Sequence, residues 1–318
     1  MAAPLLRSAL CTERSLTSPE LVAWAARIRR AWDHSGSGVP VYVHRKLWEW
    51  LYIIEALAER DLLRPGCRGL GFGVGQDPLA ALFASRGCEV VATDVSGAQA
   101  AQDGWIDSGQ HASEADQLNQ FGVCDPDRFA ELVRFREVDM RHVPDDLRGF
   151  DFTWSACAFE HLGSLAAGQE FVLRQMDCLR PGGFAVHTTE FNVASNRSTE
   201  GTGQTVLYRR RDIVRLAEQL RRLGHRVDLD FSAGTDPADT HVDEEPWTDT
   251  HLKVRFHGFV TTSLALIVEK DPSGRSHPWQ PDRRWRAHRA AERLRFGAER
   301  RLHRLADRAA HSGSRPAT

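Results

Sequence analysis

Apolar residues recur along this chain with two spacings that alternate from segment to segment. Spacings of three and four are typical of helices buried on one face, whereas short apolar runs and strict alternation are typical of strands. The pattern predicts helices over residues 19–33, 46–63, 77–86, 96–102, 125–133, 165–179 and 211–223. It predicts strands over residues 70–72, 90–94, 136–139, 150–155, 184–190, 225–231 and 259–268. Because helices separate the first five strands, we expect an α/β fold with a mostly parallel, seven-stranded sheet covered by helices on both faces.

The same pattern divides the chain into three parts. Residues 1–44 form an N-terminal helical extension, which we expect to cap the next part. Residues 45–270 hold all seven predicted strands and therefore form the central domain. Residues 271–318 begin as a linker and continue as an Arg-rich helical tail.

Three glycines follow the first strand at alternate positions: Gly71, Gly73 and Gly75. Glycines there leave room for a ligand to lie against the main chain, although a plain tight connection to the next helix would use them as well. The second strand ends at Asp94, and a parallel sheet brings this carboxylate to the same edge, where it can accept both hydroxyls of a ribose. A dinucleotide fingerprint would place its third glycine at Gln76, so the spacing disfavours a Rossmann oxidoreductase.

Several motifs in order resemble the class I, Rossmann-like methyltransferases that use S-adenosylmethionine (SAM). The G-x-G-x-G turn is followed by Asp94, by Asp139 after the third strand, and by L-R-P-G-G at residues 179–183 before the fifth. The resemblance covers roughly residues 46–270. The chain departs from the family at Gly69, where an acidic residue is usual, so Asp94 is left as the ribose partner.

The resemblance implies SAM as the cofactor. In the family, the acid after the third strand takes the adenine amino group and the next side chain packs on the ring, which points to Asp139 and Met140. A helix upstream of the glycines caps the pocket, so that Arg45 would meet the methionine carboxylate. The full set of implied cofactor-binding residues is Gly71, Phe72, Gly73, Gly75, Asp94, Val95, Asp139, Met140 and Ser155.

Methyl transfer to a hydroxyl needs a base to take its proton. His161 follows the fourth strand, where the acceptor is expected, and we interpret it as this base, with Glu160 orienting it or helping to hold a divalent metal. A purely structural Glu-His pair at a helix start explains the two residues equally well. The second-line candidates are His187, Glu190 and His111. No ligand spacing demands a metal, although Glu160, Glu190 or the acidic loop near residues 243–246 would suit one.

Four further segments resemble a bacterial subgroup of the family that is met near glycan and natural-product biosynthesis. They are R-K-L-W-E-W, W-x-x-x-G-Q-H, F-D-F-x-W-S-x-C-A-F-E-H-L-G-S and H-T-T-E-F-N. This resemblance favours O-methylation of a sugar, a glycan or a related small-molecule hydroxyl. An amine or phenol acceptor, and a non-catalytic protein that binds SAM or a nucleotide for regulation, remain as alternatives.

Composition places the chain among ordinary globular proteins, with 42% hydrophobic and 26% charged residues. It has no apolar run long enough for a transmembrane helix, and its N-terminus lacks the features of a secretory signal. The six cysteines form no C-x-x-C pair. We therefore expect buried, reduced thiols in a cytoplasmic protein rather than disulfides or a zinc site.

The net charge of −2 conceals a basic tail. Residues 272–318 hold 12 Arg against 4 Asp and Glu, a balance of +8, which leaves −10 for the rest of the chain. The tail is either a solvated helix against the acidic body or a contact for an anionic membrane surface or polyanionic substrate. Nucleic acid is disfavoured because no recognised nucleic-acid module accompanies the tail. The oligomeric state stays open.

Overall fold

The structure is a computed structural model that describes residues 5–33, 36, 38–103, 105, 110–248, 250–292 and 294. The chain divides into two compact units, residues 1–278 and residues 279–318. Within the second unit, the described residues include the Trp279–Trp285 ring contact and an Asp282 side chain that accepts from the backbone N–H of Trp285 (2.7 Å). All further elements belong to the first unit.

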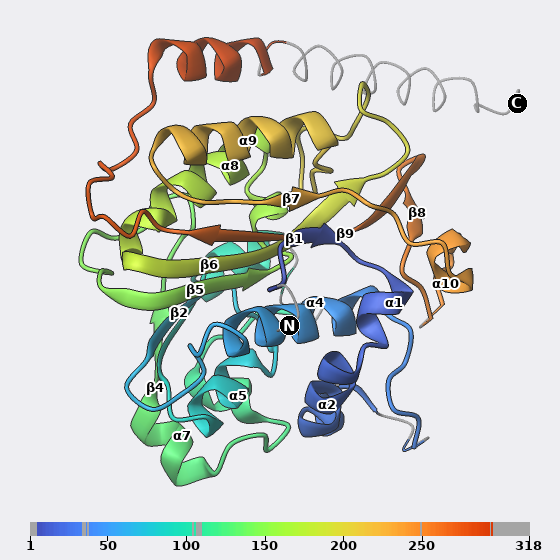
Figure 1. The fold of residues 1–318 in the computed structure, drawn as a ribbon, viewed down its shortest axis with the longest axis vertical. Helices are drawn as coiled ribbons and strands as arrows, with labels where there is room; N and C mark the ends of the chain where they lie inside the picture. The colour runs from blue at the N-terminus through green and yellow to red at the C-terminus, as the bar shows by residue number, and fades with distance from the viewer. Residues whose placement is uncertain are drawn as a thin grey trace, which may run out of the picture. The chain divides into compact units, whose positions relative to one another are not determined.

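A single sheet runs through the first unit (Figure 1). Its strands are β1 (Ser8–Leu10), β2 (Arg68–Phe72), β3 (Glu89–Asp94), β4 (Val133–Glu137), β5 (Phe150–Ala156), β6 (Leu179–Asn192), β7 (Leu229–Asp230), β8 (Val254–Phe256) and β9 (Phe259–Glu269). The spatial order is β4-β3-β2-β5-β6-β9-β1-β7, with β8 paired to β9. The first five strands in this order are parallel, and β9 is antiparallel to β6. This confirms a mixed α/β fold with a mostly parallel centre.

Helices cover both faces of the sheet, as predicted. The α-helices are α1 (Glu13–Leu16), α2 (Pro19–Arg27), α3 (Arg29–Trp32), α4 (Arg45–Ala58), α5 (Leu79–Ser85), α6 (Gly97–Asp103), α7 (Pro126–Leu132), α8 (Leu165–Gln175), α9 (Arg210–Arg222) and α10 (Pro237–Thr240). Short 3-10 helices are η1 (Ala115–Asn119), η2 (Phe159–His161) and η3 (Met176–Cys178). Figure 1 shows α4 and α5 on one face and α8 and α9 on the other. Local chemistry sets the starts of these helices: the Ser164 hydroxyl, for example, caps α8 by accepting from Ala167 N–H (3.1 Å).

The predicted count of seven strands is wrong, because the described residues form nine. The two unpredicted strands, β1 and β8, have three residues each, which is too short for a local apolar pattern. The strand predicted over residues 225–231 shrinks to the two residues of β7. Residues 180–183 were expected to form the turn before the fifth strand. Instead they lie inside β6 as an irregularity, because Leu179 pairs with Phe150 while Phe184 pairs with Phe152.

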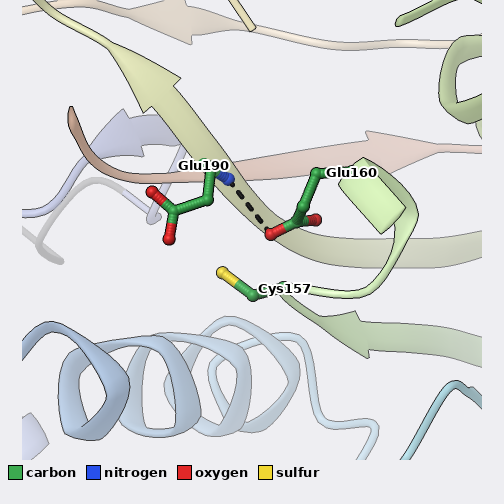
Figure 2. A group of neighbouring side chains, drawn as sticks. All are labelled: Cys157, Glu160 and Glu190. Carbon is green, nitrogen blue, oxygen red and sulfur yellow. Dashed lines mark hydrogen bonds between the residues drawn. The ribbon is translucent and has the colours of Figure 1, made fainter. Parts of the chain in front are cut away.

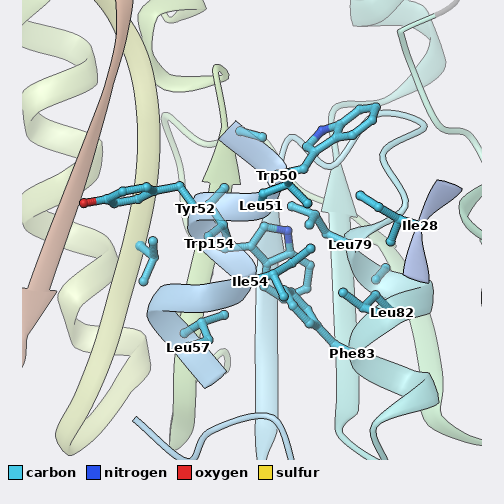
Figure 3. Packing of buried hydrophobic residues seen from close by; sticks show 14 of the residues in the cluster. Ile28, Trp50, Leu51, Tyr52, Ile54, Leu57, Leu79, Leu82, Phe83 and Trp154 are labelled. Atoms are coloured by element: carbon cyan, nitrogen blue, oxygen red, sulfur yellow. The ribbon is translucent and has the colours of Figure 1, made fainter. Parts of the chain in front are cut away.

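The main core lies between α4, α5 and the sheet (Figure 3). Leu51, Ile54 and Leu57 of α4 are fully buried. Under them, Phe83 of α5 meets the Trp154 ring edge-on, with ring centroids 4.9 Å apart. Burying each such side chain contributes roughly 1.5–3 kcal/mol, so this face fixes α4 firmly against the strands. The packing holds α4 against β5, β6 and β9.

No helix among the described residues is both long and apolar enough to cross a lipid bilayer. All six cysteines are free; five are buried, and Cys157 is half-buried. Cys157 is therefore the thiol with the greatest access to its surroundings.

Candidate active site

A cavity of about 390 Å³ opens where strands β2, β3 and β5 end. This is the edge of an open parallel sheet at which ligands are expected. Seven of the residues predicted for the site line this cavity: Gly73, Gly75, Asp94, Val95, Asp139, Met140 and His161. The other residues that line it are Lys46, Trp50, Val74, Gln76, Asp77, Trp105, Gln110, His111, Arg141, Ala156, Cys157, Ala158 and Leu162.

The glycine turn and Asp94 contact each other at one end of this cavity. Gly73 and Gly75 have φ angles of +55° and +52°, a conformation that suits glycine. The Asp94 carboxylate accepts from Gly75 N–H (3.0 Å) and from Val95 N–H (2.8 Å). Burial raises the pKa of Asp94, while these backbone donors act in the opposite direction. The Asp94 carboxylate thus points toward the glycine turn, as the sequence predicts.

His111, a second-line base candidate, helps to hold this end of the cavity. Its Nε2 donates to the carbonyl of Val95 (2.8 Å), the residue that follows β3. The next residue, Ala112, contributes a long backbone hydrogen bond to the Asp94 carboxylate (3.4 Å). His111 therefore supports the loop around Asp94 while it lines the wall.

Asp139 and Met140 lie on the wall beyond β4, whose last residue is Glu137. The sequence predicts that this strand ends at Asp139, so Asp139 lies two positions farther into the following loop than expected. Asp139 accepts from the backbone N–H and the Nε–H of Arg141, both at 2.9 Å. Partial burial raises the pKa of Asp139, but the hydrogen bonds from Arg141 outweigh this effect and hold it below its usual value. A carboxylate that stays ionised can accept a further donor from a ligand.

His161 comes from η2, directly after β5, and its ring reaches the cavity. The ring Nδ1 lies 2.9 Å from the backbone carbonyl oxygen of Gln204 and 3.3 Å from the Thr205 hydroxyl. Trp105 meets the ring at a centroid distance of 4.5 Å and an interplanar angle of 67°. Burial lowers the pKa of His161, which favours the neutral imidazole that a proton acceptor needs.

Three of the predicted cofactor residues do not line the cavity: Gly71, Phe72 and Ser155. A Cβ at Gly71 would lie 2.4 Å from the Trp154 ring, so this glycine serves the packing of the sheet. Phe72 projects to the face covered by α8 and meets Phe171 edge-on at 5.1 Å. Ser155 is buried and hydrogen-bonded to Nδ1 of His187 (2.8 Å). His187, which the sequence offers as a second-line base, is likewise not among the residues that line the cavity.

Glu160 does not contact His161 in the way the sequence hypothesis required. It lies beside Cys157 and Glu190, and the ligand atoms of these three residues are within 4.8 Å of one another (Figure 2). Glu160 accepts from the Thr189 hydroxyl (3.1 Å) and from the backbone N–H of Glu190 (3.3 Å). Among the described residues, the ring of His161 is held by the Gln204 carbonyl instead.

The Cys157, Glu160 and Glu190 cluster has a ligand set that a divalent cation would accept, yet its oxygens already have protein partners. Arg45 forms an ion pair with Glu190, and the Thr261 hydroxyl donates to the same carboxylate. The guanidinium of Arg45 thus supplies positive charge to the cluster. Arg45 is for this reason directed at Glu190 and is not on the cavity wall, where the expected carboxylate contact would lie.

Sequence reasoning missed Lys46, which lines the cavity one residue after Arg45. Its Nζ lies 2.9 Å from a carboxylate oxygen of Glu49, which is buried and also accepts from the Ser263 hydroxyl (2.5 Å). The i, i+3 spacing of Lys46 and Glu49 was the available signal. Asp77 was also missed: burial raises its pKa to about 6, although the charge of Lys46 acts against this shift.

The missed part of the wall also includes Trp50, Trp105, Cys157 and Leu162. Cys157 has a φ of +50°, which turns the chain sharply at the end of β5 and brings the thiol to the wall. No periodic pattern in the sequence marks a single residue in this conformation.

Comparison with known proteins adds one family match. Residues 70–187, from β2 into β6, match the sequence family described as "Methyltransferase domain". No curated protein sequence matches this chain. The matched range contains the glycine turn, Asp94, Asp139, Met140 and His161.

Several solved structures are similar to this chain. A TehB-like SAM-dependent methyltransferase from Corynebacterium glutamicum is 17% identical, covers 80% of this chain and 100% of its own, and gives a TM-score of 0.40. A SAM-dependent methyltransferase from Mesorhizobium loti is 15% identical, with coverages of 68% and 97% and a TM-score of 0.41. The 1,6-didemethyltoxoflavin-N1-methyltransferase of Burkholderia thailandensis, solved with S-adenosylhomocysteine, is 19% identical, with coverages of 85% and 93% and a TM-score of 0.42.

The family match and the cavity geometry agree on the same residues. A glycine turn, a facing carboxylate at the end of β3 and a second carboxylate beyond β4 all lie inside the matched range. Residues 70–187 therefore match a methyltransferase domain, and they contain the glycine turn and the two carboxylates that the sequence resemblance assigns to S-adenosylmethionine.

Proposed function

We propose that this protein is an O-methyltransferase that acts on a hydroxyl of a sugar, a glycan or a related small molecule. The observation that carries the proposal is the position of His161 on the cavity wall, beyond the end of β5, with a ring that burial keeps neutral. A hydroxyl is a weak nucleophile until a base removes its proton, whereas an amine can attack in its neutral form. A neutral histidine in the cavity therefore favours a hydroxyl acceptor.

The cofactor would lie across the cavity in one orientation. Asp94 would accept the ribose hydroxyls beside the glycine turn, and Asp139 and Met140 would receive the adenine. Lys46, rather than Arg45, would meet the methionine carboxylate, because Lys46 is the cation of α4 on the wall. This orientation directs the sulfonium toward Cys157 and His161.

The reaction would be an in-line displacement at the methyl carbon. The acceptor oxygen forms a bond to this carbon while the carbon–sulfur bond breaks, and the electron pair of that bond stays on sulfur as the sulfonium becomes a thioether. His161 takes the hydroxyl proton as the oxygen attacks. Trp50 and Trp105 offer aromatic surface for holding the acceptor in the near-attack geometry on which the rate depends.

We also infer that the protein works in a reducing compartment such as the cytoplasm, since its cysteines are free thiols. The proposed contact of the basic tail with an anionic surface concerns residues that lie mostly outside the described part of the chain. The acceptor itself is proposed to be a small molecule or glycan rather than a nucleic acid.

The test is methyl transfer from labelled SAM to a panel of saccharides, phenols and amines, with SAM and S-adenosylhomocysteine binding followed by calorimetry. We expect transfer to a saccharide and a loss of about 10²–10⁴-fold in kcat for His161→Ala, with S-adenosylhomocysteine affinity nearly unchanged. His241→Ala, at an exposed histidine away from the cavity wall, is the matched control. Transfer only to amines, or cofactor binding without transfer to any acceptor, would contradict the proposal.

A further inference from the structure

The segment formed by residues 201–206, which we call the strap, runs antiparallel to residues 160–165. Three backbone hydrogen bonds hold the two together: Leu165 N–H to the carbonyl of Gly201 (3.2 Å), Gly203 N–H to that of Gly163 (3.2 Å), and Val206 N–H to that of Glu160 (3.1 Å). The strap is thus attached on both sides of His161. It comes from a part of the chain some forty residues beyond η2, outside the family match.

The strap determines which ring nitrogen of His161 carries the proton. A backbone carbonyl oxygen can only accept a hydrogen bond, so Nδ1, 2.9 Å from the Gln204 oxygen, must be the N–H. In a neutral imidazole, the other nitrogen then keeps its lone pair. The Thr205 hydroxyl, 3.3 Å from Nδ1, lies on the same side of the ring and adds a second polar neighbour to that N–H.

We propose that the strap is a positioning element that fixes His161 as the Nδ1–H tautomer and so makes Nε2 the proton acceptor of the cavity. The proposal rests on the function proposed above and adds to it the group that orients the base. Glu160, which precedes His161 in the chain, does not have this role, because its carboxyl group is bonded to Thr189 and Glu190. Burial lowers the pKa of His161 and so favours the neutral ring, although the hydrogen bonds with the backbones of Gln204 and Cys157 act in the opposite direction.

Gly203 offers a way to disturb the strap without touching the cavity. Its φ is +125°, which an L-residue rarely adopts, and no atom lies within 4 Å of a Cβ built there. Gly203→Ala should therefore strain the strap backbone without a clash. Gly258 is a matched control, because it also has a positive φ (+80°) and open space around its Cβ but lies in the β8–β9 hairpin turn.

The experiment is a long-range ¹H–¹⁵N correlation spectrum of the full chain labelled with ¹⁵N-histidine at pH 7, with the His161 signals assigned by their loss in His161→Ala. The wild type should show protonated Nδ1 and unprotonated Nε2 for His161. Gly203→Ala should shift these signals toward a mixture of tautomers and lower kcat at least tenfold, with the affinity for S-adenosylhomocysteine unchanged. Gly258→Ala should alter neither reading.

An Nε2–H tautomer or an imidazolium in the wild type would overturn the proposal, as would an unchanged His161 spectrum in Gly203→Ala. If Gly203→Ala does not fold, Thr205→Val serves instead: it should shift the Nδ1 signal, and Thr205→Ser should restore it. The spectrum needs no acceptor and no methyl transfer. Failure of the wild type to bind S-adenosylhomocysteine would refute the proposed function alone, whereas a wrong tautomer with normal binding would refute the role of the strap alone.

Discussion

At the scale of single residues, Glu160 has the most unusual surroundings of the carboxyl groups near the site. Its side chain is fully buried and lies beside Glu190, which forms an ion pair with Arg45. Burial, and after it the charge of Glu190, raise the pKa of Glu160 to about 8. Two carboxyl groups this close resist being ionised together, so the Glu160 side chain is protonated at neutral pH.

This predicts that Glu160→Gln becomes more stable relative to the wild type as pH rises. The unfolded chain releases the proton near the ordinary value of 4.5, whereas the folded chain holds it until about pH 8. Wild-type stability therefore falls as pH rises between these values, at up to about 1.4 kcal/mol per pH unit, and levels off above pH 8. Glutamine does not titrate and mimics the neutral acid. Urea unfolding of both proteins at pH 5, 7 and 9 measures the difference, and an offset that is the same at all three values would contradict the prediction.

The sequence predicted wall positions correctly for residues just after a strand, but it also expected them for strand residues whose side chains point into the core. Asp94 and Val95 follow directly from the end of β3. Phe72 and Ser155 belong to strands of the same edge, but their side chains point into the core. The sequence places Arg45 at the pocket, whereas the structure has Lys46 on the cavity wall and pairs Arg45 with Glu190. One helical step rotates a side chain by about 100°, and the apolar stripe does not fix that angle closely enough to distinguish the two residues.

At the scale of elements, the connection from β2 to α5 lines the end of the cavity at which Asp94 lies. Gly75 donates its N–H to Asp94 and passes close to the loop that carries His111. A Cβ at Gly75 would lie 2.5 Å from the carbonyl oxygen of Gln110. Backbone atoms cannot move aside as flexible side chains do, so this element tolerates only glycine here.

We predict that Gly75→Ala weakens S-adenosylhomocysteine binding at least tenfold and lowers the free energy of unfolding by about 1–3 kcal/mol, from the positive φ and the displaced loop. Gly66→Ala is the matched control. Gly66 also has a positive φ (+86°), but a Cβ there meets no atom within 4 Å. It should cost stability without loss of affinity. Calorimetry and urea unfolding measure both quantities, and equal affinity losses in the two variants would count against this account.

Element boundaries could be predicted where a cap or a glycine marks them, but not where one element passes directly into the next. The boundaries from β2 to β3 were predicted to within about two residues, because Gly87 marks the connection after α5 and Asp94 marks the end of β3. In contrast, α7 ends at Leu132 and β4 begins at Val133, with no intervening loop residue. The predicted strand at residues 136–139 was therefore placed about two residues too late.

At the scale of the whole molecule, the sheet depends on pairings between the two ends of the first unit. β1 lies between β9 and β7, so that Leu10 pairs with Leu264 across more than 250 residues of chain. The Ser8 hydroxyl accepts from the N–H of Ile267 (2.9 Å), and Cys11 N–H donates to the carbonyl of Ser263 (2.8 Å). Pairings between strands so far apart in the chain are not marked by any periodic pattern in the local sequence. For this reason the parallel centre of the sheet could be predicted and its antiparallel extension could not.

Truncations at the two ends of the chain should therefore differ strongly in their effect on stability. Deletion of residues 1–12 removes β1 and opens the sheet between β9 and β7. It also exposes Leu264, Leu266 and the Ser263 carbonyl, so we expect the Tm to fall by about 10 °C or more, or folding to fail.

Deletion of residues 279–318 removes the second compact unit and leaves the first with its own core, so we expect one cooperative transition and unchanged S-adenosylhomocysteine affinity. Thermal unfolding followed by circular dichroism, with calorimetric titration, measures both. Equal losses of stability in the two proteins would show that β1 is dispensable or that the two units share one core.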